Sequence, residues 1–176
     1  TPTTDIYTVP LHDALPILGI IPENKEQKTK VKQWNIESAL TANPFLKDSF
    51  RLVQANLMFM NIDKKIKVIM FTSPWPAEGK TNTISGMALI LASSGKRVLL
   101  IDCDLRRGKV HTMFNINRTS GLTNCLAEGT DCSVNFNSFS TFTNLSILTT
   151  GVLPPNPIDV IATTAFENFI NDTKGQ

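Results

Sequence analysis

The sequence predicts an α/β fold with a mostly parallel sheet flanked by helices, because short β-branched apolar runs alternate with segments of helical periodicity. The apolar runs, each of a length suited to a strand buried on both faces, are 66–71, 97–102 and 144–151. The segments with helical spacing are about 44–60, 80–95, 121–129 and 157–172. Strands that alternate with helices in this way form parallel sheets with right-handed crossovers.

Local signals support several of these boundaries. Asn43-Pro44 is a typical start signal for the first helix. Its apolar residues then recur three or four positions apart, at Phe45, Leu46, Phe50, Val53, Leu57 and Met60. Gly95 is a plausible C-cap for the second helix, and Pro157 stands in the first turn of the last one. Phe136, Phe139 and Phe142 alternate with polar residues, which indicates a strand or a packed loop.

The composition is typical of a folded, soluble domain. With 176 residues, 41% of them hydrophobic and 18% charged, the chain is long enough for one core. A net charge of +2 is too small to indicate nucleic-acid binding. Cys103, Cys125 and Cys132 are odd in number and lack C-x-x-C spacing, which argues against a disulfide framework and for a reducing compartment. No apolar run reaches the ~18 residues of a transmembrane helix.

The first 42 residues differ from the rest. Residues 1–17, TPTTDIYTVPLHDALPI, resemble a translated sequencing adapter and are predicted to be a non-native leader, with a genuine extended leader as the alternative. This leader contains Tyr7, the only tyrosine. Residues 18–42 are predicted to be a linker, whose lysines could also face an acidic membrane surface. The predicted domain covers 43–176.

A candidate phosphate loop, 72–79, lies between the first predicted strand and the next helix and runs into Gly79-Lys80-Thr81. Such loops bind phosphate because backbone N–H groups surround the anion in front of a helix N-terminus. Lys80 would reach the β- and γ-phosphates, and the Thr81 hydroxyl would ligate Mg²⁺. The G-x-x-x-x-G-K-[ST] pattern lacks its first glycine, because Pro74 stands there.

Two carboxylates follow the next predicted strand at the same edge of the sheet. Asp102 and Asp104 could hold a hydrated metal ion and accept a proton from an attacking hydroxyl, whereas loop capping is the structural alternative. The predicted metal ligands are Thr81 and Asp102. The predicted catalytic residues are Lys80, Asp102 and Asp104, and either aspartate could be the base.

TSPWPAEGKT followed by KRVLLIDCDLR resembles the bacterial tyrosine kinases (BY-kinases) that regulate capsule and exopolysaccharide export. Their loop reads S-x-x-P-G-E-G-K-[ST] and does not begin with the usual glycine. It matches here at Ser73, Pro76, Glu78, Gly79, Lys80 and Thr81, with Ala77 in place of a glycine. The D-x-D-x-R motif of the family matches at Asp102, Asp104 and Arg106. Its G-L-x-x-x-L and G-x-x-P-P-N-P segments match within 121–126 and 151–157.

The resemblance implies a P-loop NTPase-like fold, ATP and Mg²⁺ as cofactors, and protein-tyrosine kinase activity that regulates polysaccharide chain length and export. The nucleotide-binding residues that it implies are Pro76, Ala77, Glu78, Gly79, Lys80, Thr81 and Asn82. It also implies a cytoplasmic domain of an inner-membrane protein. The implied partners are a membrane domain of the same or a partner chain, the polysaccharide export machinery, and further copies of the chain.

The chain departs from the family at several positions. The family's oligomerisation helix carries E-x-x-R-x-x-R, whereas this chain has Asp48, Arg51 and Gln54, so self-association through Asp48 and Arg51 is expected to be weakened. Gly86 and Gly108 stand where the family has asparagine and proline. The third nucleotide motif and the tyrosine-rich tail are expected after residue 172 and are not in this sequence. The domain is therefore expected to be incomplete at its C-terminus and inactive by itself.

Two other functions compete with a kinase. An ATPase switch of the chromosome-partitioning or septum-placing type carries a lysine five residues before the loop lysine, where this chain has Trp75. The third interpretation is that the chain is a truncated, non-catalytic nucleotide-binding fragment. His111, in the loop after the second strand, is better explained as a packed histidine than as a catalytic one, because nothing pairs it with a nucleophile.

Overall fold

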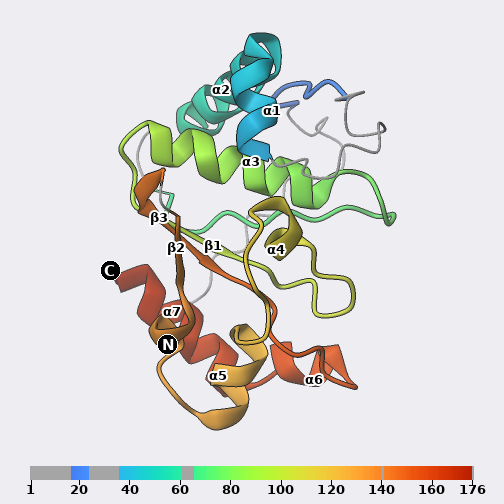
Figure 1. The fold of residues 1–176 in the computed structure, drawn as a ribbon, viewed down its shortest axis with the longest axis vertical. Coiled ribbons are helices and arrows are strands. Elements are labelled where there is room, and N and C mark those ends of the chain that lie inside the picture. Colours follow the sequence, from blue (N-terminus) through green and yellow to red (C-terminus); the bar gives the residue numbers. More distant parts are fainter. Residues whose placement is uncertain (1–16, 24–35, 61–65, 140, 176) are drawn as a thin grey trace.

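A computed structural model describes residues 17–23, 36–60, 66–139 and 141–175 (Figure 1). The helices are α1 (Ile36–Ala42), α2 (Pro44–Phe59), α3 (Lys80–Ser93), α4 (Val110–Met113), α5 (Leu122–Glu128), α6 (Pro157–Ile161) and α7 (Thr164–Gly175), with a short 3₁₀ helix, η2 (Cys132–Asn135). The strands are β1 (Val98–Ile101), β2 (Asn137–Phe139) and β3 (Phe142–Leu148). Within these residues no helix has both the length and the apolar character needed to cross a membrane.

The three strands form one small mixed sheet in the order β1-β3-β2. β1 and β3 are parallel, with Val98 opposite Leu145, and β2 runs antiparallel to β3. The α/β class is therefore confirmed, and the parallel pair joins the two predicted strands 97–102 and 144–151. Phe139 ends β2 and Phe142 begins β3, in agreement with the expected strand or packed loop.

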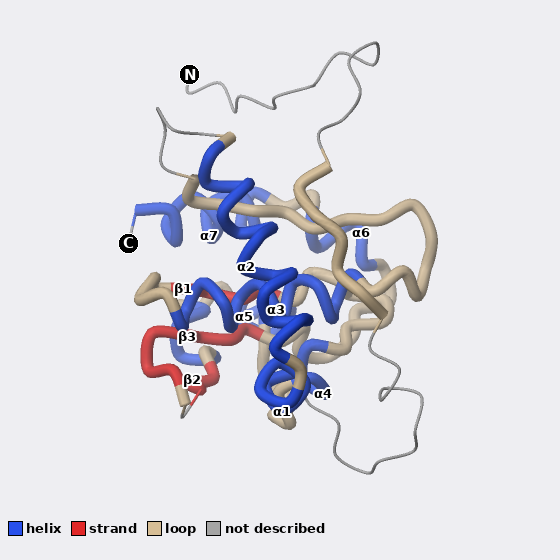
Figure 2. Tube along the Cα trace, turned by 90° about the horizontal axis from the view of Figure 1, so that it is seen from above, coloured by secondary structure: helices blue, strands red, loops and turns tan. Residues whose placement is uncertain are grey.

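Helices cover both faces of the sheet. Figure 1 shows α3 on one face, with α1 and α2 outside it, and α5, α6 and α7 on the other, and Figure 2 shows the arrangement from above. The apolar residues of β1 alternate accordingly: Leu100 packs in the cluster that contains α2 and α3, whereas Leu99 and Ile101 pack on the cluster that contains α5. The domain thus has two apolar cores, one on each side of the sheet.

Helix α3 lies at the centre of the larger core. Its sequence after the first turn, ISGMALILAS, is apolar on every side, and residues 85–90 and Ala92 are buried. It contacts α1, α2 and α4 as well as β1 and β3. A helix without a polar face is stable only when neighbours surround it, so α3 requires both the outer helices and the sheet. Gly95 follows it with φ of 79°, the left-handed conformation expected of a residue just after a helix.

Helix α2 begins where the sequence predicts. The Asn43 side chain accepts a hydrogen bond from the N–H of Leu46 at 3.0 Å, and Pro44 occupies the first helical position. The buried side of the helix carries Leu46, Phe50 and Val53. Phe50 packs against the backbone of α3 at Gly86, where an added Cβ would overlap the phenyl ring. The glycine at a position where the family has asparagine therefore makes room for this ring.

The predicted linker, 18–42, contains folded structure in its described parts. Residues 36–42 form α1, with Ile36, Ala39 and Leu40 buried. The extended segment around Leu18 lies against α2, because the Asn56 side-chain amide donates a hydrogen bond to the Leu18 carbonyl at 2.7 Å. The linker prediction is therefore wrong for these parts. Residues 1–16, with Tyr7, and the lysine-rich residues 24–35 lie outside the described part of the chain.

The strand predicted at 66–71 is not formed. The segment is irregular, Val68 and Met70 are 52% and 83% exposed, and the Lys67 ammonium donates to the carbonyl of Lys174 in α7 at 2.8 Å. An apolar β-branched run favours an extended, buried chain, but a strand also needs a neighbour for its backbone N–H and C=O groups. Among the described residues β1 pairs only with β3, and 66–71 does not pair with the free edge of β1, so the run remains irregular.

The helix predicted at 157–172 is divided in two. α6 ends at Ile161, and the Thr163 hydroxyl accepts the N–H of Phe166 at 3.2 Å. A threonine that takes a backbone N–H three residues ahead acts as an N-cap, so the chain restarts as α7 at Thr164 instead of continuing. Periodicity alone does not distinguish a restarted helix from a continuous one.

The prediction against a disulfide is also wrong. Cys125 in α5 and Cys132 in η2 are bonded to each other, with their Cα atoms 5.1 Å apart, and Cys103 is the free cysteine of the described residues. An odd number of cysteines excludes complete pairing but not a single bridge. The left-handed turn at Gly129 brings the chain back, with the N–H of Thr130 donating to the Cys125 carbonyl at 3.1 Å.

We predict that Gly86→Ala lowers the free energy of unfolding by about 1 kcal/mol or more, because the new methyl group overlaps the Phe50 ring in a closely packed core. In a Phe50→Leu background the same change should raise stability by up to ~1 kcal/mol, because only the helix propensity of alanine remains. Urea unfolding of the four proteins measures both effects. An increase in stability on Gly86→Ala in the unaltered chain would contradict the packing described above.

Candidate nucleotide-binding site

Two loops that carry the predicted site residues lie on one side of the molecule. Loop 72–79 leads into α3, and the loop 102–109 follows β1. Figures 1 and 2 both place these loops beyond the same end of the sheet, next to the N-terminus of α3. This is the edge where open α/β sheets bind their ligands. The strand that was expected to precede loop 72–79 is not formed, so the loop is held from its α3 end.

The phosphate loop is folded on its own backbone. The Ser73 hydroxyl donates to the Trp75 carbonyl at 2.9 Å, and the N–H of Trp75 donates to the Glu78 carboxylate at 3.2 Å. Two residues take the left-handed conformation, Ala77 with φ of 66° and Gly79 with φ of 90°. Alanine rarely adopts this conformation, because its Cβ approaches the following carbonyl oxygen. The position where the family has glycine is thus one where glycine is favoured.

The N-terminus of α3 has the properties of an anion site. Gly79 is its N-cap residue and supplies no side-chain acceptor. The first intrahelical bond runs from the N–H of Thr83 to the Gly79 carbonyl at 2.8 Å. Because Gly79, Lys80 and Thr81 lie at the start of a helix of 14 residues, the positive end of its dipole is directed toward the loop. An added Cβ at Gly79 would contact nothing within 4 Å, which leaves space in front of the helix.

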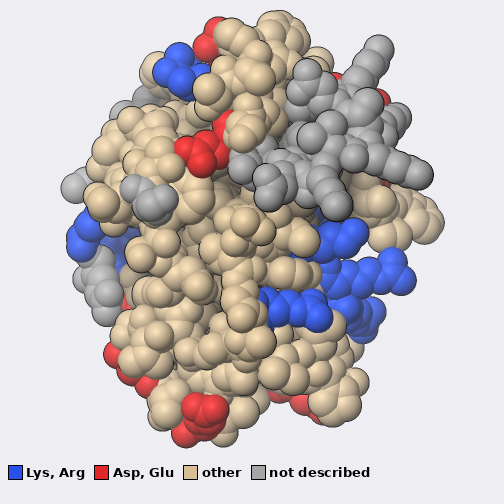
Figure 3. Space-filling view, in the orientation of Figure 1, with Lys and Arg blue, Asp and Glu red and all other residues tan. Residues whose placement is uncertain are grey.

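The exposure of the predicted nucleotide-binding residues changes along the loop. Pro76, Ala77 and Glu78 are exposed, whereas Gly79, Lys80, Thr81 and Asn82 are half-buried at the start of α3. Figure 3 shows lysine and arginine side chains gathered on the side where loops 72–79 and 102–109 lie. The second loop contributes the exposed residues Arg106, Arg107 and Lys109. A concentration of positive charge on this side favours a polyanionic ligand.

Asp102 lies at the end of the parallel strand pair, where its N–H donates to the Leu148 carbonyl at 2.9 Å. Its side chain is buried, and its two carboxylate oxygens accept from the N–H groups of Asp104 at 3.1 Å and Val110 at 3.0 Å. Burial raises the pKa of the Asp102 carboxyl, whereas the two N–H hydrogen bonds lower it. The carboxylate therefore caps its own loop, as the structural alternative predicted, and this leaves its other lone pairs for a ligand.

Asp104 has a similar local role and is less buried. Its carboxylate accepts the N–H of Arg107 at 3.0 Å and so closes the turn that follows. His111, in the first turn of α4, is partly buried, and its Nδ1 atom has no hydrogen-bond partner among the described residues. Burial lowers the pKa of His111, and the nearby Arg118 adds to this effect, so the imidazole favours the neutral form. The assignment of either aspartate as a catalytic base stays a prediction.

The sequence analysis missed a polar cluster beside Asp102. Thr149 and Thr150, just after β3, are fully buried, and their carbonyls accept the N–H groups of Leu122 at 2.9 Å and Thr123 at 3.0 Å. The Asn124 side chain accepts from the N–H groups of Gly121 at 3.1 Å and Val152 at 3.3 Å. These bonds join the two matched glycine-containing segments. Polar residues directly after a buried strand, Thr-Thr-Gly, were the available signal.

Gly108 allows this cluster to approach Asp102. A Cβ at Gly108 would overlap the Thr150 methyl group and lie 2.8 Å from the Asp102 carboxylate. The absence of a side chain at 108 thus lets the loop close over Asp102 and onto the end of β3.

The residues present fit a nucleotide phosphate better than a metal ion alone. The uncapped N-terminus of α3 and the basic surface suit an anion. Among the described residues no group of three His, Cys, Asp or Glu side chains could hold a metal ion. The predicted ligands Thr81 and Asp102 would therefore need phosphate oxygens and water to complete an Mg²⁺ shell, which is the usual situation for Mg²⁺ bound with a nucleotide.

Known proteins are similar to this chain in sequence and in fold. No protein-family model matches the chain. The tyrosine-protein kinase YwqD of Bacillus subtilis is 37% identical over 115 residues, which are 65% of this chain and 48% of YwqD. The putative tyrosine-protein kinase CapB of Staphylococcus aureus is 33% identical over 127 residues, 72% of this chain and 55% of CapB. The solved BceF tyrosine kinase domain is 29% identical with a TM-score of 0.76, covering 92% of this chain and 67% of that domain.

The chain belongs to the bacterial tyrosine kinase family. It spans about half the length of YwqD and CapB. The structure shows the surroundings of three residues that depart from the family's pattern. Gly86 packs against the Phe50 ring, Gly108 lies close to Asp102, and Ala77 has the left-handed conformation. The expected P-loop domain of a BY-kinase is confirmed, and the small mixed sheet is the part of it that this chain forms.

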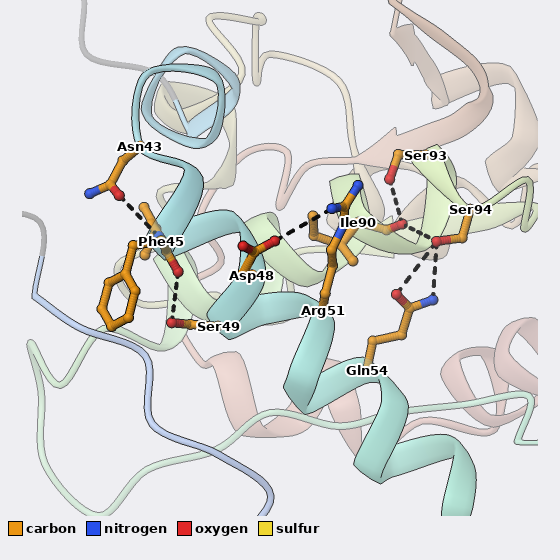
Figure 4. Close-up of polar contacts among 10 residues, drawn as sticks. Asn43, Phe45, Asp48, Ser49, Arg51, Gln54, Ile90, Ser93 and Ser94 are labelled. Atoms are coloured by element: carbon orange, nitrogen blue, oxygen red, sulfur yellow. Dashed lines mark hydrogen bonds and ion pairs between the residues drawn. The ribbon is translucent and has the colours of Figure 1, made fainter.

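Asp48 and Arg51, the residues predicted to contribute to self-association, lie in α2. Figure 4 shows the Arg51 guanidinium directed to the Asp48 carboxylate of its own helix, at 3.4 Å, and both side chains are exposed. Gln54 reaches a different element, because its amide lies 3.3 Å from the Ser94 hydroxyl just after α3. The two charged residues therefore pair within one chain, and Gln54 has a role in packing α2 against α3.

We predict that Ala77→Gly raises the free energy of unfolding by about 0.5–1 kcal/mol, because relief of the left-handed conformation outweighs the added entropy of the unfolded chain. Ala127→Gly, at an exposed position of α5, is the matched control and should lower stability by about 0.5–1 kcal/mol. Urea unfolding measures both variants. If Ala77→Gly lowered stability as much as the control does, the loop would not have the conformation described.

Proposed function

We propose that this chain is the nucleotide-binding part of an ATP-dependent protein-tyrosine kinase domain that acts in capsule or exopolysaccharide production. The observation that carries the proposal is the N-terminus of α3, which begins at Gly79-Lys80 without a side-chain cap and faces the same side as the Asp102 loop. Phosphoryl transfer needs a phosphate cradle and carboxylates at one sheet edge. The printed names of YwqD and CapB as tyrosine-protein kinases support the same activity.

The proposed role of each residue in phosphoryl transfer follows from its chemistry. ATP with Mg²⁺ supplies the phosphoryl group and part of the charge neutralisation. The N–H groups at the start of α3 and the Lys80 ammonium bind phosphate oxygens, and the exposed backbone of Pro76 to Glu78 lies along them. Thr81 and Asp102 provide oxygen ligands for Mg²⁺. Asp104, which is less buried than Asp102, accepts the proton of a tyrosine hydroxyl, and Asp102 is the alternative base.

The loop around Asp102 is well suited to hold a ligand group in place. Both carboxylate oxygens accept hydrogen bonds from backbone N–H groups, and Gly108 lies close to the side chain. A side chain held in this way loses little further freedom when it binds a ligand. Preorganisation of this kind supports a site role in addition to the capping role of Asp102.

The competing functions have less support. An ATPase switch of the partitioning or septum-placing type would carry a lysine at the position of Trp75, which is 69% exposed at the tip of the loop. The relatives with printed functions are kinases, which also disfavours the switch. A purely structural, non-catalytic nucleotide-binding piece would share the phosphate loop, so it differs from a kinase only in transfer to tyrosine.

The proposed partners follow from the surface and the relatives. The outer side of α2 exposes Phe45, Leu52 and Phe59 beside the Asp48–Arg51 pair, and we propose that further copies of the chain bind there. A relative in Klebsiella pneumoniae is named as a putative tyrosine-protein kinase in a cps region. We propose that this chain lies on the cytoplasmic side of an inner-membrane protein, with a membrane domain and the polysaccharide export machinery as partners.

We predict that Lys80→Ala lowers the affinity for ADP-Mg²⁺ by about 30- to 1,000-fold, because a charged hydrogen bond to phosphate worth roughly 2–4 kcal/mol is lost. Lys96→Ala removes the same charge from the exposed turn after α3 and should leave the affinity unchanged. Isothermal titration calorimetry of the folded chain measures both variants. Unchanged binding by Lys80→Ala, or an equal loss in Lys96→Ala, would exclude a specific contact at Lys80.

A further inference from the structure

We infer that Cys125 and Cys132 are a redox modification site, which exchanges reversibly between a disulfide and two thiols with a small thiol of the glutathione class. The two cysteines are bonded in the structure and are seven residues apart in the sequence. They lie in the smaller core, on the face of the sheet away from α3. This inference rests on the cytoplasmic location proposed above: disulfides of intracellular proteins are commonly transient or redox-sensing, so a single bridge there calls for a functional explanation.

The bridge joins two elements that also pack against each other, α5 and η2. Cys125 is in α5, whose first turn is fixed by hydrogen bonds to Thr149 and Thr150. Cys132 is the first residue of η2, and Val134 in the same short helix is 76% exposed. The connection between them turns at Gly129, which has a positive φ of 63°. The disulfide therefore closes a short surface loop and holds η2 against the end of α5.

A pocket gives a small thiol access to the bridge. It has a volume of about 270 Å³ and lies between the Cys125–Cys132 loop and α7. Both cysteines line it, together with Asp131, Phe136, Phe169 and Asp172. This volume is many times that of a water molecule, so a cysteinyl side chain can enter. Both cysteines are buried, Cys132 at 5% exposed and Cys125 at 1%, and we assign the less buried Cys132 as the sulfur that an incoming thiol attacks.

The reduced form also has its polar requirements met. The Cys125 sulfur lies 3.2 Å from the Leu122 carbonyl oxygen, so a thiol at this position has an acceptor without rearrangement of α5. On the side away from the pocket the pair packs with apolar side chains such as Leu122 and Leu148, which suits a neutral thiol as well as a disulfide. Both states of the pair are therefore compatible with the same core, and this is what reversible exchange requires.

The exchange is balanced with glutathione disulfide as the oxidant. The Cys132 thiolate attacks one sulfur of glutathione disulfide, breaks its S–S bond and releases one glutathione thiolate. The Cys125 thiolate then attacks Cys132 in the mixed disulfide and releases the second glutathione. The two protein sulfurs are oxidised, the two glutathione sulfurs are reduced, and the two protons of the cysteine thiols end on the glutathione thiols. Reduction runs the same steps in reverse.

The test uses the chain in buffers with different ratios of reduced to oxidised glutathione. After acid quenching, the unfolded protein is alkylated with N-ethylmaleimide. Mass spectrometry then gives the number of labels on each chain. We expect a reversible change from three labels under reducing conditions to one label, on Cys103, under oxidising conditions. The oxidised form should also melt on the order of 5 °C higher, because closing the loop restricts the unfolded chain.

Variants assign the change to this pair. Cys103→Ser should keep the transition, now between two labels and none, whereas Cys125→Ser and Cys132→Ser should each abolish it. Peptide mapping of the unaltered chain gives the same assignment if a variant does not fold. The inference is overturned if all three cysteines are labelled under oxidising conditions, or if the oxidised partner is Cys103. A bridge that persists in a large excess of reduced glutathione would also overturn it, because the disulfide would then be purely structural.

Discussion

The structure depends on the burial of helix α3 from all sides. Its interior has no polar face, so the outer helices α1 and α2 and the strands β1 and β3 must all pack against it. Apolar burial contributes roughly 25 cal/mol per Å², so a helix surrounded in this way is a main source of stability in a small domain. The polar first turn, Lys80 to Thr83, is the only part of α3 that can be directed to a ligand.

The same helix links the packing of the core to the chemistry of the site. The close contact of Phe50 with Gly86 fixes α2 on α3, and the N-terminal turn of α3 fixes the open end of loop 72–79. At the neighbouring edge, Gly108 lies close to both Asp102 and Thr150, the Asp102 backbone is bonded to the end of β3, and its carboxylate is bonded to its own loop. In both places a missing side chain produces the close approach. Gly86 and Gly108, two of the departures from the family's pattern, are therefore both closely packed.

The sequence allowed the α/β class, β1, β3, α3 and the side of the site to be predicted, because apolar runs and cap signals such as Asn43 and Gly95 act locally. It did not allow the irregular structure of 66–71 to be predicted, because strand formation also needs a pairing partner. The division of 157–172 depends on one hydroxyl, that of Thr163, which offers the backbone an alternative to a continuous helix. The Cys125–Cys132 bridge depends on the turn at Gly129, and the capping by Asp102 on the position of Val110, which spacing alone does not specify.

The central claim is that the start of α3 and the loop after β1 form one nucleotide site at the same edge of the sheet. Amide hydrogen exchange with and without ADP-Mg²⁺, read by mass spectrometry, tests it most directly. The account predicts that residues 85–92 exchange slowest in the free chain, and that the nucleotide slows exchange in both 77–83 and 102–110. Slowed exchange in only one of these loops, or only near α5 and α7, would contradict a single site at this edge of the sheet.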